Sequence, residues 1–166
     1  GLQIVRRPDR IWILRDGAQV PGVSWPSVSA DKRELELDVP GEIVLSNGWT
    51  LTAEKMDATL SAWPALFEDP DEFQAMIDGA AFPGPFTIRS RKSGERFRPL
   101  GLEGQSQKIS DFMINLKLPA GARSSWPLVD YGGEVVWVPG FRLADHARVR
   151  PNTRTLIRLC MRPPGL

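Results

Sequence analysis

Residues Phe86–Gly101 read FTIRSRKSGERFRPLG, and this stretch decides how the rest of the chain is interpreted. A short apolar run opens it, and Ser93-Gly94 is a turn signal between two groups of basic residues. The five cations that fall within ten residues are Arg89, Arg91, Lys92, Arg96 and Arg98. Alternate side chains of a strand share a face, so the pattern predicts an antiparallel hairpin that presents four guanidinium groups to one anion. Arginine suits that task because its planar fork pairs with two phosphate oxygens at once.

The charge is uneven along the chain, although the net charge of the 166 residues is only +1. Residues 1–85 hold seven Lys and Arg residues against fourteen Asp and Glu residues. Residues 86–125 hold eight against three, and residues 126–166 hold six against three. An acidic first half and a basic second half favour a polyanion as the partner of the second half. The alternative is that two oppositely charged surfaces face the solvent or each other.

Short strand-like runs between turn signals predict a chain that is mainly β. The expected strands are residues 2–6, 10–15, 34–39, 42–46, 49–54, 86–90, 128–131, 134–138 and 155–161. Asn47-Gly48 and Gly132-Gly133 are two-residue turn signals, so they predict hairpins between the strands beside them. Phe73–Ile77 fits either a strand or one helical turn, and Gly17–Lys32 is rich in Pro, Ser and Gly and predicts a loop.

The clearest helix signal covers Gly104–Leu118. Its apolar residues at positions i, i+3, i+4 and i+7 are Ile109, Phe112, Met113 and Leu116, which form one face. Ser106 is the expected N-cap and Pro119 the expected end, and a second short helix is expected in Pro119–Ser125. One or two helices grouped among many strands predict an α+β fold.

Side chains able to carry out catalysis are sparse in this sequence. His146 is the only histidine, and no nucleotide-binding loop or nucleophile elbow occurs. We interpret the acidic run Asp69/Asp71/Glu72 as a solvated face and Cys160 as a buried small hydrophobe. The absence of 18 consecutive apolar residues predicts no membrane-spanning helix, and one cysteine fits a reducing cytoplasm. We therefore expect binding, with no catalytic residue and no metal site in this chain.

Three ordered segments carry a family resemblance. Arg89–Gly101 resembles an arginine-rich signature built around G-D-R-F, Gln107–Val129 resembles a helix followed by P-L-V, and Gly132–Val149 resembles a hairpin containing W-V-x-G. In this order they resemble the C-terminal region of bacterial tRNA(Ile)-lysidine synthetases, and Leu37–Glu54 resembles an upstream strand pair of that family. Glu95 stands where the family usually has Asp, and we expect its longer arm to reach a neighbouring arginine or a turn amide.

The resemblance implies a β-sandwich or barrel-like domain with one or two short helices, a fold shared with the phenylalanyl-tRNA synthetase β chain. It implies a β-rich segment 1–82 with hairpins at 2–15 and 34–54, packed on a tRNA-binding domain 83–162, and a tail 163–166. The family attaches lysine to C2 of the wobble cytidine of a CAU-anticodon tRNA(Ile), with ATP as the energy source. Its S-G-G-x-D-S loop does not occur in this sequence, and the chain starts at Gly1 without Met. We therefore expect a piece of the enzyme, with ATP and Mg²⁺ bound in a missing N-terminal domain and no cofactor here.

The resemblance and the charge pattern together predict a grip on the acceptor-stem side of tRNA(Ile), in the cytoplasm. The residues expected to contact RNA are Arg89, Arg91, Lys92, Arg96, Arg98, Lys108, Lys117 and Arg123. The alternative is that some of these arginines pair with the acidic first half, and that Arg123 or Arg142 is a structural tie. Phe97 is expected to anchor the hairpin in the core. The alternative is a protein–protein or self-association module such as a homodimer, because six tryptophans are many for this length. A free-standing hydrolase is the weakest interpretation.

Overall fold

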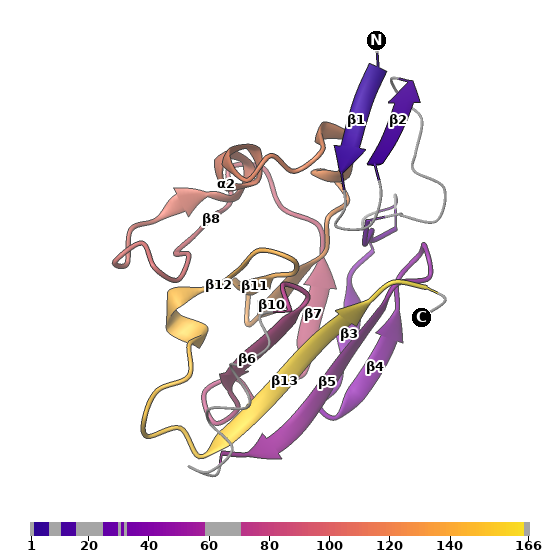
Figure 1. The fold of residues 1–166 in the computed structure, drawn as a ribbon. Helices are drawn as coiled ribbons and strands as arrows, with labels where there is room; N and C mark the ends of the chain where they lie inside the picture. The colour runs from indigo at the N-terminus through magenta and orange to yellow at the C-terminus, as the bar shows by residue number, and fades with distance from the viewer. Residues whose placement is uncertain are drawn as a thin grey trace.

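The computed structural model describes residues 2–6, 11–15, 25–29, 31, 33–58 and 71–164 (Figure 1). Its strands are Leu2–Arg6 (β1), Ile11–Arg15 (β2), Leu35–Leu37 (β3), Gly41–Val44 (β4), Thr50–Asp57 (β5), Gln74–Asp78 (β6), Phe86–Arg89 (β7), Arg96–Phe97 (β8), Gln107–Lys108 (β9), Leu128–Tyr131 (β10), Glu134–Val138 (β11), Arg142–Leu143 (β12) and Thr155–Arg162 (β13). Its helices are Ile109–Asn115 (α2) and two 3₁₀ segments, Ala120–Ala122 (η1) and Asp145–Ala147 (η2). No helix in these ranges is long and apolar enough to cross a membrane.

Two larger sheets form the body of the fold, and each combines strands that are far apart in the sequence. The five-stranded sheet has the order β12-β11-β10-β7-β3, and the four-stranded sheet has the order β4-β5-β13-β6. Strand β3 pairs with β7, and the last strand, β13, lies between β5 and β6. Strands from both of the expected segments, 1–82 and 83–162, therefore contribute to each sheet (Figure 1).

The main core lies between these two sheets. Buried side chains from both sheets belong to one apolar cluster, including Leu37 and Trp137 from one sheet and Leu51 and Ile157 from the other. Burial of each large apolar side chain contributes roughly 1.5–3 kcal/mol. The observed sandwich of β-sheets with one α-helix confirms the predicted α+β, mainly β fold class.

A second, smaller core attaches α2 and the β8–β9 ribbon to the five-stranded sheet. Ile109, Phe112 and Met113 are the buried residues of α2, and they join a cluster that also contains Phe97. The rings of Phe97 and Phe112 meet edge to face with their centroids 4.9 Å apart. Phe97 is 6% exposed, so its predicted role as a core anchor is confirmed.

The expected hairpins around Asn47-Gly48 and Gly132-Gly133 are both present, as is the pairing of Leu2–Arg6 with the strand after it. The segment Phe73–Ile77 was expected to be either a strand or one helical turn. Its residues Gln74–Ile77 form most of strand β6. Trp63, Asp69 and most of the loop expected at 17–32 lie outside the described residues.

The predicted hairpin over Phe86–Gly101 is wrong. Strand β7 pairs with β3 and β10 in the large sheet, whereas β8 pairs with β9 in a separate two-stranded sheet. Phe86 and Ile88 enter the main core, and Phe97 enters the second core. Residues 90–95 therefore cross from one core to the other, because each core takes the apolar residues of one strand.

The predicted start of the helix is also wrong. Residues Gln107–Lys108 pair with β8 as a strand, so α2 begins at Ile109 with Lys108 as its N-cap residue. Ser106 does not cap the helix, because its hydroxyl and carbonyl oxygens accept hydrogen bonds from Arg96. The second short helix that was expected after Pro119 is the 3₁₀ segment η1.

Gly140 allows a close backbone approach at the edge of both cores. Its φ is 80°, and a Cβ there would lie 2.9 Å from Cε1 and Cζ of the Phe73 ring. We expect Gly140→Ala to lower the free energy of unfolding by about 2–4 kcal/mol, through left-handed backbone strain and overpacking. Urea denaturation measures the loss. The control is Gly121→Ala, since no atom lies within 4 Å of its added methyl group, and equal losses in the two variants would contradict the explanation.

Candidate nucleic-acid interface

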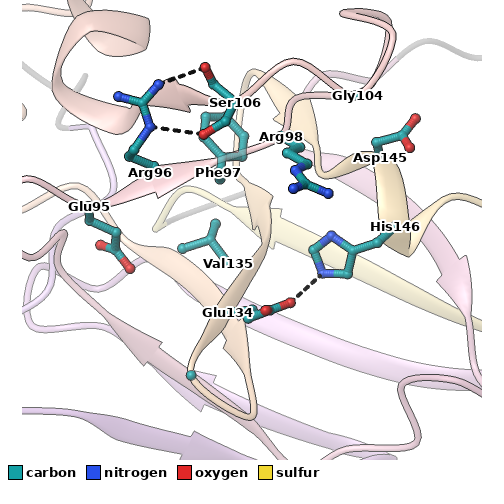
Figure 2. A pocket seen from close by; sticks show the side chains of 11 residues that line it. Glu95, Arg96, Phe97, Arg98, Gly104, Ser106, Glu134, Val135, Asp145 and His146 are labelled. Atoms are coloured by element: carbon teal, nitrogen blue, oxygen red, sulfur yellow. Dashed lines mark hydrogen bonds and ion pairs between the residues drawn. The ribbon is translucent and has the colours of Figure 1, made fainter.

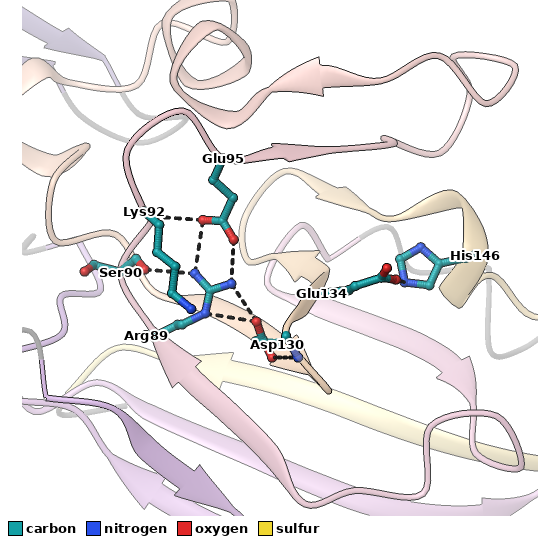
Figure 3. A network of polar contacts seen from close by, with 8 residues as sticks. Arg89, Ser90, Lys92, Glu95, Asp130, Glu134 and His146 are labelled. Atoms are coloured by element: carbon teal, nitrogen blue, oxygen red, sulfur yellow. Dashed lines mark hydrogen bonds and ion pairs between the residues drawn. The ribbon is translucent and has the colours of Figure 1, made fainter.

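Arg89 at the end of β7 is the centre of a buried polar network (Figure 3). Its Nε and Nη2 donate to Oδ2 of Asp130 at 2.9 and 2.6 Å. Its Nη2 and Nη1 donate to Oε1 and Oε2 of Glu95 at 2.5 and 3.0 Å, and Nη1 also donates to the Ser90 carbonyl oxygen at 3.1 Å. Two carboxylates from different elements therefore share one guanidinium group.

Backbone amides complete the network. Glu95 Oε2 accepts the Lys92 N–H at 2.9 Å, and Asp130 Oδ1 accepts the Gly133 N–H at 2.9 Å. The expectation that Glu95 reaches a neighbouring arginine or a turn amide is confirmed, since it reaches both. The network thus joins β7, the 90–95 loop, β10 and the β10–β11 turn.

The ionisation of this network follows from its geometry. Burial alone would lower the pKa of Arg89, but hydrogen bonds to Glu95 and Asp130 and their negative charges raise that pKa above its ordinary value. Burial also acts to raise the pKa of Glu95, yet the hydrogen bonds from Arg89 and the Lys92 amide lower it. Arg89 and Glu95 are therefore both charged at neutral pH.

Arg89 is not part of the exposed cationic surface, which corrects its predicted place. The residue is 2% exposed, and its partners are the buried side chain of Asp130 and the half-buried side chain of Glu95. The pattern of alternating arginines does not predict the burial of Arg89, because the more deeply buried of its two carboxylate partners, Asp130, lies 41 positions away in the sequence. One local signal was available: an Asp shortly before Gly-Gly often accepts a hydrogen bond from the turn that follows.

Two of the exposed cations lie on the β8–β9 ribbon. Arg96 lies directly opposite Lys108, and both side chains are exposed while Phe97 enters the core from the other face. Arg96 is held in place by Ser106, whose Oγ and carbonyl oxygen accept from Nε and Nη2 at 2.9 and 2.8 Å. Like charges directly opposite each other on a ribbon repel, so a bound anion would stabilise this pair.

A cleft of about 470 Å³ lies beside this ribbon (Figure 2). Its walls are formed by Glu95, Arg96, Phe97, Arg98, Gly104, Ser106, Gly133, Glu134, Val135, Asp145 and His146. His146 Nε2 lies 3.6 Å from Glu134 Oε2, and Asp145 Oδ1 lies 3.3 Å from Arg148 Nη1. The side chain of Arg98 is exposed and makes no hydrogen bond or ion pair with any residue that the structure describes. The guanidinium group of Arg98 is therefore free to bind an anion at this cleft.

The remaining predicted cations fall into different surroundings. Lys92 and Lys117 are exposed. Arg91 is half-buried, with an Nε that is buried and has no partner among the described residues. Arg123 Nε donates to the Leu118 carbonyl oxygen at 2.8 Å, so Arg123 ties the connection between α2 and η1, in agreement with the structural alternative. Arg142, the other arginine expected as a possible structural tie, is exposed and donates to the Leu100 carbonyl oxygen.

Other reactive groups give no second site in the part of the chain that the structure describes. No three His, Cys, Asp or Glu side chains lie close enough there to hold a metal ion. Cys160 on β13 is half-buried, less deeply than predicted, and burial raises the pKa of its thiol, which favours the neutral form. The charged groups at this surface are therefore the exposed cations of the ribbon, together with a cleft that Arg96 and Arg98 line beside the carboxylates of Glu95, Glu134 and Asp145.

Comparison with known proteins matches the segment that holds these residues to a known domain. A family model described as the TilS substrate C-terminal domain matches residues 86–160, the segment that holds the network, the ribbon and the cleft. This segment belongs to the TilS C-terminal domain family. The crystal structure of a TilS C-terminal domain covers 81% of this chain and 98% of its own, with a TM-score of 0.68 and 24% identity. That likeness confirms the fold.

Curated relatives extend the match beyond the TilS C-terminal domain. The tRNA(Ile)-lysidine synthase of Symbiobacterium thermophilum is 33% identical over 138 residues, which are 82% of this chain and 27% of the relative. The synthase of Geobacter sulfurreducens is 29% identical over 149 residues, which are 90% of this chain and 30% of that relative. The chain thus spans less than a third of the length of these relatives. A weaker likeness, with a TM-score of 0.49, is to an N-terminal fragment of the phenylalanyl-tRNA synthetase β-subunit from Pyrococcus horikoshii.

Proposed function

We propose that this chain is the tRNA-binding part of a tRNA(Ile)-lysidine synthetase, acting in the cytoplasm. The parent enzyme would attach lysine to C2 of the wobble cytidine of a CAU-anticodon tRNA(Ile), using ATP. The relatives that match most of this chain carry the name of that enzyme, and the matched domain model names it as well. The chain itself would hold the tRNA on its acceptor-stem side.

The observation that carries this proposal is a set of exposed cations close together in the chain, of which Arg96 and Arg98 line the cleft. Lys92, Arg96, Arg98 and Lys108 come from one loop and one two-stranded ribbon, and the guanidinium group of Arg98 has no partner among the described residues. A duplex RNA stem is recognised mainly through phosphates, 2′-hydroxyls and shape, which suits a surface of this kind. Lys117 lies just after the C-cap of α2 and Arg91 on the 90–95 loop, and both would extend the contact.

The proposed role separates holding the substrate from changing it. In the proposal, ATP and Mg²⁺ bind to another part of the parent enzyme, and the cleft residues of this chain take no part in the chemical step. Contacts made equally in the ground state and the transition state change substrate affinity and not the rate of the bound complex. Loss of these cations from the parent enzyme should therefore raise KM for tRNA and leave kcat close to its original value.

Binding of tRNA(Ile) to this chain over a series of salt concentrations tests the proposal. Each phosphate contact contributes a slope of about −0.7 to −0.9 to the plot of log K against log salt, so four to six contacts predict a slope of roughly −3 to −5. Filter binding with a transcript of the tRNA measures both affinity and slope. No binding, binding that ignores salt, or a tight dimer by sedimentation that hides Lys92 and Arg98 would contradict it.

A further inference from the structure

Arg89 links two segments of the cleft wall that are far apart in the sequence. Through Glu95 it holds the loop that carries Lys92, and through Asp130 it holds the turn at Gly133. Glu95 and Gly133 both line the cleft, so the network reaches the cleft wall at two places. Glu95 is labelled in Figures 2 and 3.

The guanidinium group of Arg89 has no hydrogen-bonding capacity left for a ligand. A guanidinium group carries five N–H donors, and Arg89 makes five hydrogen bonds, two to Asp130, two to Glu95 and one to the Ser90 carbonyl oxygen. The group is also buried, with 3% of its side chain exposed. A direct contact with a phosphate would have to break bonds to the buried carboxylate of Asp130 or the half-buried carboxylate of Glu95, which is costly.

We propose that Arg89 is a positioning residue for the RNA-binding surface. It holds the 90–95 loop and the β10–β11 turn at a fixed separation, so that Lys92, Arg96 and Arg98 are presented in one arrangement before RNA arrives. Fixing the cations in advance reduces the entropy that binding must remove. This inference rests on the proposed function for its RNA partner, but the coupling of the two wall segments is a property of the chain alone.

Arg89→Lys is the most informative variant for the coupling. Lysine keeps the positive charge but cannot donate in a planar fork to two carboxylates and a carbonyl oxygen at once. We expect amide hydrogen exchange at both Lys92 and Gly133 to quicken at least tenfold, with exchange in β13 unchanged. The control Arg158→Lys, made at the exposed pair with Glu54, should leave Lys92 and Gly133 as they are. Unchanged exchange at either amide in Arg89→Lys would overturn the proposal, whether or not RNA binds.

Glu95→Gln gives a test whose sign separates positioning from simple charge. If Glu95 acted only as a negative charge near the phosphates, its removal would strengthen tRNA binding. If it positions the loop, its removal should weaken binding about threefold or more, although a negative charge has been removed. Equal or tighter binding by a folded Glu95→Gln variant would overturn the positioning role. Failure of the unchanged chain to bind tRNA would instead contradict the proposed function and leave the exchange result to decide the coupling.

Discussion

Replacement of Arg89 by methionine should lower the free energy of unfolding by about 3–5 kcal/mol at pH 7. The reason is that the buried carboxylate of Asp130 and the half-buried carboxylate of Glu95 would lose the cation that neutralises them. Methionine fills much of the space of the arginine stem, so the loss reports charge more than cavity. Urea denaturation followed by tryptophan fluorescence measures it, since Trp126 and Trp137 are buried in the two cores.

The pH dependence of that loss gives an independent check. The folded-state pKa of Glu95 is lowered, so its contribution to stability is present at neutral pH and is lost as the pH falls through that pKa. The difference between the original chain and Arg89→Met should therefore narrow on acidification from pH 7 towards pH 3. Arg158→Met is the matched control, because its pair with Glu54 is exposed and should be worth about 0–1 kcal/mol. A loss no larger than that of the control would refute the account of the network.

Removal of Lys92, Arg98 and Lys108 together, each replaced by alanine, should weaken tRNA binding about 100-fold near 100 mM salt. Removing each cation that binds a phosphate should also flatten the salt dependence by about one unit of slope. All three side chains are exposed, and none forms an ion pair with a described residue, so the fold should survive. Filter binding gives the affinity, and urea denaturation should place the unfolding free energy within about 1 kcal/mol of the original.

The matched control removes the same charge from another surface. Arg154, Arg158 and Arg162 lie on β13 or just before it, in the four-stranded sheet, and can be replaced by alanine together. This variant should bind tRNA within about fivefold of the original chain. An equal loss in both triple variants would mean that binding follows net charge, and the ribbon and cleft would then lose their assignment.

Local signals in the sequence predicted most of the elements that form locally. The hairpins at Asn47-Gly48 and Gly132-Gly133 follow from turn residues that accept positive φ, and both are present. Phe97 was expected in the core because it is the apolar residue of a basic run. The contact of Glu95 with an arginine or an amide was expected from the family resemblance, because Glu95 keeps the charge of the usual Asp on a longer arm.

The errors arose where distant parts of the chain decide the structure. Arg89 became buried because Asp130 meets it across the sheet from β10, and no pattern within Phe86–Gly101 encodes that pairing. The start of α2 shifted because Gln107–Lys108 pair with β8, although the helical periodicity alone extends further. Short-range patterns give the elements, but the choice of strand partner depends on which core each apolar residue enters.

The position of β13 also bears on how the chain comes to be folded. This last strand lies between β5 and β6, and its register places Arg162 opposite Thr50. During synthesis, β5 and β6 would each leave the ribosome with an unpaired edge, and only the arrival of β13 could pair both. Folds that depend on such distant pairings form slowly, because a long loop must close before its contacts stabilise it. The centre of the four-stranded sheet is thus the last part of that sheet to pair. Until β13 pairs, the facing edges of β5 and β6 are open to pairing with strands of other chains.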